Sequence, residues 1–183
     1  MPTDIALLII RVAVGLVLLA HGIKHARGQK KTTAWFGSIG FRQPGMQWMA
    51  SSASEIGIGV LLVVGALTSF AAAGLIAIMV VAFISVHRYA GFWVTARPDE
   101  GWEYVFVIAS VGFAVAIGGP GSVSVDSAIG IADSVDGWVG FGIAVLGVLA
   151  AFGQVAMFYR PSEAEPAVEE GTETAAPGGL ADS

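Results

Sequence analysis

Five long apolar segments determine most of what this chain can fold into. A helix needs roughly 20 residues, at about 1.5 Å rise each, to cross the hydrocarbon core of a bilayer. The segments cover about residues 4–22, 47–66, 69–87, 101–118 and 138–159. Hydrophobic residues make up 55% of the chain and charged residues 13%, whereas soluble domains carry roughly 25% charge. Because spanning segments must satisfy their own backbone, we predict an all-α, polytopic membrane helix bundle.

The first apolar segment is predicted to remain as a membrane helix rather than to be removed as a signal peptide. Arg11 interrupts it, and a basic stretch at residues 21–27 follows where a cleavage site would have small residues. The chain contains no cysteine, which excludes disulfides, thiol redox chemistry and thiolate metal sites within it.

Basic residues fall on only one side of the predicted topology. Eight of them flank or connect the segments on that side: Lys24, Arg27, Lys30, Lys31, Arg42, Arg88, Arg97 and Arg160. The connections on the other side contain no lysine or arginine. The positive-inside rule then predicts an outside N-terminus and a cytoplasmic C-terminus.

Two stretches outside the apolar segments have a distinct composition. Residues 28–46 combine Trp35, Phe36 and Phe41 with glycines and basic residues. They are expected to form either a short amphipathic helix at the membrane surface or an ordinary basic loop anchored by aromatics. Residues 161–183 are rich in Glu, Ala, Pro and Gly without aromatics, which predicts a disordered, acidic cytoplasmic tail.

Small residues at spacings of four mark a packing face on the last apolar segment. Gly140 is followed by Ala144, and Gly147 by Ala151. This spacing allows membrane helices to approach closely, so we interpret these residues as packing positions.

Two charged residues are expected near the middle of the membrane. With a core of about 30 Å and about 1.5 Å per residue, Arg11 lies about 18 Å and Glu55 about 12 Å from the cytoplasmic edge. Because charges inside a bilayer turn inward and pair, we predict a buried Arg11–Glu55 pair. The pair could serve only to fix helix register. Alternatively, it could form a polarised site that binds a headgroup or relays protons.

A second polar group is expected within about 5 Å of the cytoplasmic edge. His21, His87, Glu103 and Tyr104 come from three different segments, and Lys24 lies just below them. They form a candidate site for a ligand, a quinone headgroup or protons; no metal site is predicted. The alternative is that these polar tips only extend to the interface, where such side chains are common.

A series of short motifs along residues 6–126 resembles, in order, the DoxX family of small bacterial integral membrane proteins. The motifs are Arg11-x3-Gly15, His21-Gly22-x-Lys24, Glu55-x-Gly57, His87, Gly101-x-Glu103-Tyr104, and GGPGSVSVD at 118–126. The resemblance implies a four-helix membrane core over residues 1–126. An outer loop and a fifth transmembrane helix over 127–160 and the tail over 161–183 extend beyond it.

The resemblance also implies an association with redox chemistry. Family members are linked to thiosulfate–quinone oxidoreductase subunits and, in mycobacteria, to a membrane oxidoreductase complex with superoxide dismutase and a thiosulfate sulfurtransferase. We therefore expect a multi-pass protein of the bacterial plasma membrane that serves a quinone-linked, oxidative-stress or thiosulfate-related complex, without independent catalysis. A quinone is the cofactor that this role would involve.

Other functions remain open at this point. A non-catalytic scaffold or assembly factor could recruit soluble partners through the basic connection and the acidic tail. A small-molecule carrier is less favoured, because five spans are few for an inverted-repeat transporter. Haem ligation by His21 and His87 is supported only by the similar depth of these two histidines. The expected partners are the lipid bilayer, other complex subunits and a second copy of the chain, and not nucleic acid.

Overall fold

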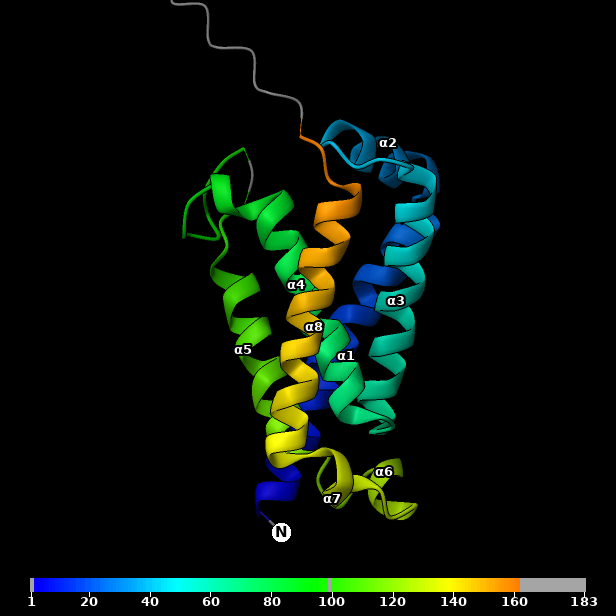
Figure 1. Cartoon of the computed structure of the whole chain (residues 1–183), viewed down its shortest axis with the longest axis vertical. Helices are drawn as coiled ribbons and strands as arrows, with labels where there is room; N and C mark the ends of the chain where they lie inside the picture. The colour runs from blue at the N-terminus through cyan, green and yellow to red at the C-terminus, as the bar shows by residue number, and fades with distance from the viewer. Residues whose placement is uncertain (1, 99, 162–183) are drawn as a thin grey trace, which may run out of the picture.

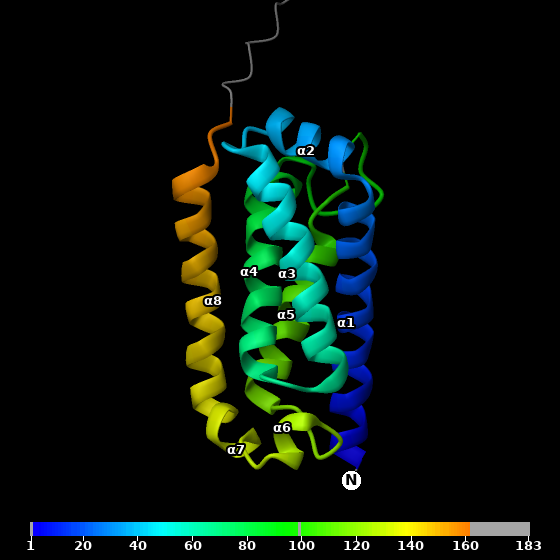
Figure 2. The ribbon, with the colours of Figure 1, turned by 90° about the vertical axis from the view of Figure 1, so that its right-hand side faces the viewer.

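The computed structural model describes residues 2–98 and 100–161, and these fold as a bundle of helices. The long helices lie side by side (Figures 1 and 2): α1 (Pro2–Arg27), α3 (Pro44–Val64), α4 (Thr68–Ser85), α5 (Glu103–Gly118) and α8 (Gly137–Phe158). The short elements lie at the two ends of the bundle: α2 (Gln29–Ser38), η1 (His87–Tyr89), α6 (Val125–Ala128) and α7 (Ala132–Val135). The predicted all-α membrane bundle is confirmed.

Within the described residues, four helices are long and apolar enough to cross a membrane: α1, α3, α4 and α8. The fourth predicted segment forms α5, an apolar helix of 16 residues. At 1.5 Å per residue α5 is about 24 Å long, and it runs alongside α4 and α8 in the same bundle (Figure 1). The chain is therefore a multi-pass membrane protein.

The two ends of the bundle differ in charge. We call one of them the basic end, because the helix ends and loops there carry the eight basic residues named above (Figure 1). We call the other the N-terminal end; it holds the start of α1, the α3–α4 turn, α6 and α7 (Figure 2). At the basic end, residues 29–38 form the helix α2, which buries Thr32 and Phe36. The predicted disordered tail lies outside the described residues beyond Pro161.

Glycines set the distance and register between α1 and α3. A Cβ added to Gly15 would lie 2.9 Å from the carbonyl oxygen of Gly59, and one added to Gly59 would lie 2.8 Å from that of Gly15. Further along, a Cβ on Gly22 would lie 2.9 Å from that of Glu55. Because any side chain would push the backbones apart, these glycines fix which residues of α3 each turn of α1 faces.

The packing face predicted on α8 is confirmed. Gly140, Ala144, Gly147 and Ala151 are its buried residues. A Cβ on Gly147 would collide with the backbone of Ala73 in α4. The small residues therefore allow α8 to lie directly against its neighbours.

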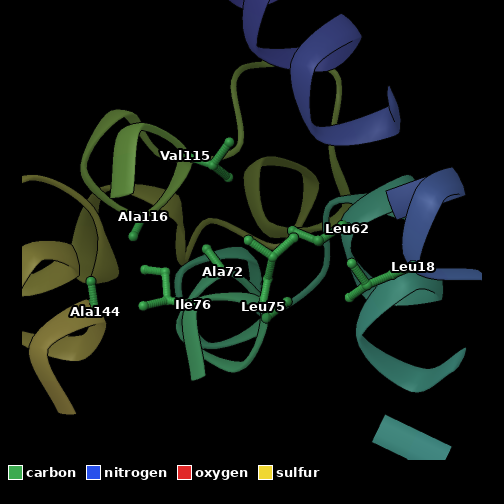
Figure 3. Packing of buried hydrophobic residues seen from close by; sticks show 9 residues of the cluster. Leu18, Leu62, Ala72, Leu75, Ile76, Val115, Ala116 and Ala144 are labelled. Atoms are coloured by element: carbon green, nitrogen blue, oxygen red, sulfur yellow. The ribbon is translucent and has the colours of Figure 1, made fainter. Parts of the chain in front are cut away.

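The main apolar core draws one or more residues from each of the five long helices. Leu75 and Ile76 of α4 lie at its centre and are fully buried (Figure 3). In Figure 3, Leu62 lies beside Leu75, and Ile76 lies on the side of α4 that faces Ala144. The central helix α4 thus connects α1 and α3 on one side with α5 and α8 on the other.

Candidate functional site

Arg11 is buried at the N-terminal end, where it satisfies backbone carbonyls of two other segments. Its Nη1 donates to the carbonyl oxygens of Leu62 (2.9 Å) and Val63 (2.8 Å) at the end of α3. Its Nε donates to Pro120 (3.1 Å) and its Nη2 to Val123, both in the loop after α5. The guanidinium therefore joins α1, α3 and the 119–124 loop, a role suited to its rigid fork of donors.

Asp126 completes this arrangement from α6, which directly follows that loop. Its carboxylate is fully buried and accepts the backbone N–H groups of Leu67 (2.7 Å) and Thr68 (2.8 Å). Its own N–H donates to the carbonyl oxygen of Gly65 (2.9 Å). An acid in this position satisfies donors at the start of α4, which have no partner within the helix. We refer to Arg11, Asp126 and the backbone groups they bind as the N-terminal clamp.

The predicted ion pair between Arg11 and Glu55 is wrong. Glu55 lies seven residues before Leu62 on α3, which corresponds to about 10 Å along the helix. The glycine register places Arg11 beside residues 62–63, whereas Glu55 faces Gly22. Both side chains are buried, but they lie toward opposite ends of the bundle and have different partners.

A cavity of about 600 Å³ lies near the basic end, between α1 and α3 on one side and α4 and α5 on the other. Its volume falls within the range of small-molecule binding sites, about 300–1,000 Å³. Apolar side chains such as Leu18, Met79 and Ile108 form part of its wall. Its polar lining residues are His21, Lys24, His25, Gln47, Ser51, Ser54, Glu55, Ser85, His87, Glu100, Tyr104 and Gln154.

Glu55 and His25 form the polar group on the α1–α3 side of the cavity. The Ser51 hydroxyl donates to Glu55 Oε1 at 2.8 Å, and His25 Nδ1 lies 3.2 Å from the same oxygen. The other oxygen, Oε2, is buried and has no hydrogen-bond partner among the described residues. Trp48 fixes the backbone of His25 by donating its Nε1–H to the His25 carbonyl at 2.8 Å.

His87 and Tyr104 form the polar group on the other side. His87 Nδ1 lies 2.6 Å from the carbonyl oxygen of Glu100, and the Tyr104 hydroxyl lies 2.9 Å from His87 Nε2. A carbonyl can only accept, so Nδ1 carries a hydrogen. In the neutral ring Nε2 then carries no hydrogen, and it accepts a hydrogen bond from the Tyr104 hydroxyl. The pair forms a short path along which a proton could move between the cavity and the 86–102 loop.

The structure brings most of the predicted cluster together but replaces its carboxylate. His21, Lys24, His87 and Tyr104 all line the cavity, whereas Glu103 does not. Glu103 Oε2 accepts a hydrogen bond from the N–H of Val94 at 3.1 Å. The Glu103 side chain therefore binds the loop before α5 instead of the cavity. Successive helical residues point about 100° apart, and of these two neighbours only Tyr104 lines the cavity. Glu55 supplies the carboxylate instead.

Sequence reasoning missed His25 as a site residue. A usable signal was present, because His25 follows His21 by four residues and therefore shares its face of the helix. The histidine was instead interpreted as part of a basic flank of the first segment.

The N-terminal clamp predicts which buried charge the fold depends on. Replacing Arg11 by Met should lower the free energy of unfolding by about 3 kcal/mol or more, because each buried carbonyl left without a donor costs about 1–3 kcal/mol. Glu55→Gln should have a much smaller effect, since it removes no partner of Arg11. Thermal unfolding in detergent micelles measures both. Equal destabilisation by the two variants would indicate that Arg11 and Glu55 act as a pair after all.

The chain was compared with protein-family models, with curated proteins and with solved structures. The DoxX model matches residues 6–88, from the first turns of α1 to η1. This segment contains Arg11, His25, Glu55 and His87, and it ends before Tyr104 and Asp126. Comparisons with curated proteins and with solved structures gave no match. Residues 6–88 are therefore similar to the DoxX family, in agreement with the motifs in the sequence.

Proposed function

We propose that this DoxX-like protein is the membrane subunit of a redox complex and that its cavity binds the headgroup of a quinone. The observation that carries the proposal is the cavity of about 600 Å³ with a polar group on each side and apolar side chains between them. A quinone is a flat apolar ring with a polar oxygen at each of two opposite positions. Such a ligand would match both the apolar walls and the two polar groups.

The polar groups are also of the type that quinone chemistry requires. Interconversion of a quinone and a quinol transfers protons together with electrons. Tyr104 with His87, and Glu55 with His25, offer two hydrogen-bonded pairs through which protons could be exchanged. Since the chain has no cysteine, any thiol or sulfur chemistry, and the electrons that it supplies, would belong to a partner subunit.

The basic end is proposed to face the cytoplasm of a bacterial plasma membrane. All eight lysines and arginines outside the α1 interior lie at this end, and the positive-inside rule places such an end in the cytoplasm. The mouth of the cavity, marked by the exposed His21 and Lys24, would then open toward soluble partners on the cytoplasmic side.

The orientation can be tested with single cysteines, because the natural chain has none. Ser134→Cys lies in α7 at the N-terminal end, and Ser38→Cys lies at the end of α2 at the basic end; both positions are exposed. A membrane-impermeant maleimide added to intact cells should label Ser134→Cys and should label Ser38→Cys only after the cells are permeabilised. The reverse pattern would contradict the proposed orientation.

Ligand binding can be tested by filling the cavity. Ala82 lines it, so Ala82→Phe should reduce quinone binding at least tenfold without unfolding the bundle. The matched control is Ala156→Phe, which places the same side chain on an exposed part of α8 outside the cavity. Protein purified in nanodiscs would be assayed for retained quinone by lipid extraction and mass spectrometry, and for binding of added short-chain ubiquinone and ubiquinol.

Equal binding by both variants, or none by the wild type, would contradict the proposal. If the wild type binds no quinone but is purified with a stoichiometric partner chain, a scaffold or assembly role explains the protein better.

A further inference from the structure

We infer that Gln47 binds a carbonyl oxygen of the ligand through its side-chain amide, in the part of the cavity that residues of α2, α3, α4 and α8 line. The inference rests on the proposed function and adds the residue that recognises one of the two ring oxygens. It follows from a buried amide whose donor hydrogens the folded chain leaves unused.

Gln47 is buried in the first turn of α3 with only half of its amide engaged. The side chain is 3% exposed and lines the cavity. Its oxygen accepts a hydrogen bond from Gln154 Nε2 of α8 at 3.1 Å. Its nitrogen carries two hydrogens to donate and has no partner among the described residues. Because a buried donor without a partner is unfavourable, a ligand that accepts from this nitrogen would be stabilised.

The unused nitrogen is accessible from inside the cavity. Three unpaired side-chain atoms of the described residues have essentially no accessible surface, and Glu55 Oε2 is one of them. The Gln47 nitrogen is not among them and therefore keeps some surface. Since Gln47 as a whole is buried and lines the cavity, that surface opens into the cavity. A ligand can reach this donor, whereas it cannot reach the unpaired oxygen of Glu55.

The surroundings of Gln47 favour a neutral, flat and apolar ligand. Phe36 of α2, Val81 of α4 and Phe158 of α8 pack in one apolar cluster, and all three line the cavity. The residues that α2, α4 and α8 contribute to the lining carry no charge. Burying an anion beside a neutral amide would leave its charge unpaired, which is costly. The matching acceptor is therefore a neutral carbonyl on an apolar ring, and not a carboxylate or a phosphate.

Gln154 sets the orientation of the Gln47 amide. Its donated hydrogen bond holds the Gln47 oxygen toward α8. The oxygen and nitrogen of an amide diverge from one planar carbon, so the nitrogen points away from the Gln154 donor. Gln154 is therefore a positioning residue, and Gln47 is the residue that contacts the ligand.

The test observes the carbonyl groups of the ligand directly. The full chain in nanodiscs would be loaded with decylubiquinone that carries carbon-13 at one ring carbonyl or at the other, and isotope-edited infrared spectra would be recorded. A donated hydrogen bond lowers the stretching frequency of a carbonyl. At least one of the two labelled carbonyls should absorb at a lower frequency than in nanodiscs without protein; we call this the low band.

Three variants connect the low band to Gln47. Gln47→Met keeps the length of the side chain but removes both donor hydrogens. It should abolish the low band and weaken decylubiquinone binding about five- to tenfold, the size expected for one neutral hydrogen bond. Gln154→Met removes the bond between α8 and α3 but not the Gln47 donors, so the low band should remain. Gln29→Met makes the same change at an exposed position of α2 outside the cavity and should match the wild type.

Circular dichroism and gel filtration establish that each variant is folded. If Gln47→Met does not fold, Gln47→Asn takes its place with the same expected result, because it keeps an amide but withdraws it by one methylene. If the low band persists in the Gln47 variant, or if the wild type shows none, Gln47 does not bind the carbonyl and quinone binding in the cavity stands. If the wild type binds no decylubiquinone, the proposed function fails, and this inference fails with it.

Discussion

The fold depends on one buried guanidinium that must be surrounded by acceptors. Arg11 is 1% exposed, and a charge in that position is tolerated only if its donors are satisfied. The carbonyls that satisfy it belong to the end of α3 and to the loop after α5. Asp126 of α6 accepts the N–H groups at the start of α4, so the clamp fixes α1, α3, α4 and the outer loop at the N-terminal end.

The clamp leaves the opposite end of the bundle available for a site. The main apolar core and the contact between Gly15 and Gly59 hold the helices together without Glu55, His87 and Tyr104. A cavity near the basic end can therefore keep a carboxylate oxygen without a partner. Natural proteins tolerate such locally unfavourable groups mainly where function requires them, which agrees with a binding site at this end of the bundle.

Composition and pattern were sufficient to predict the architecture, but not the partners of the polar residues. The apolar segments predicted the membrane helices, and the spacing of small residues predicted the face by which α8 packs. Depth along each helix grouped His21, His87 and Tyr104, and all three line the cavity. The depth estimate failed for the pair of Arg11 and Glu55 and for Glu103. Depth depends only on the rise per residue, whereas contact between side chains also depends on the rotation of each helix about its axis and on the register between helices. The register here is set by contacts such as Gly15 with Gly59, which a single sequence does not reveal.

The most direct test of the account is to locate the ligand on the protein by photolabelling. An azido-quinone with a short side chain would be irradiated with the protein in nanodiscs, and the labelled peptides would be mapped by mass spectrometry. The account predicts labels on cavity residues within 46–55, 78–87 and 104–108, with loss of labelling when excess decylubiquinone is present. Labels confined to the exposed surface of α8, or labelling that excess quinone does not reduce, would contradict a quinone site in the cavity.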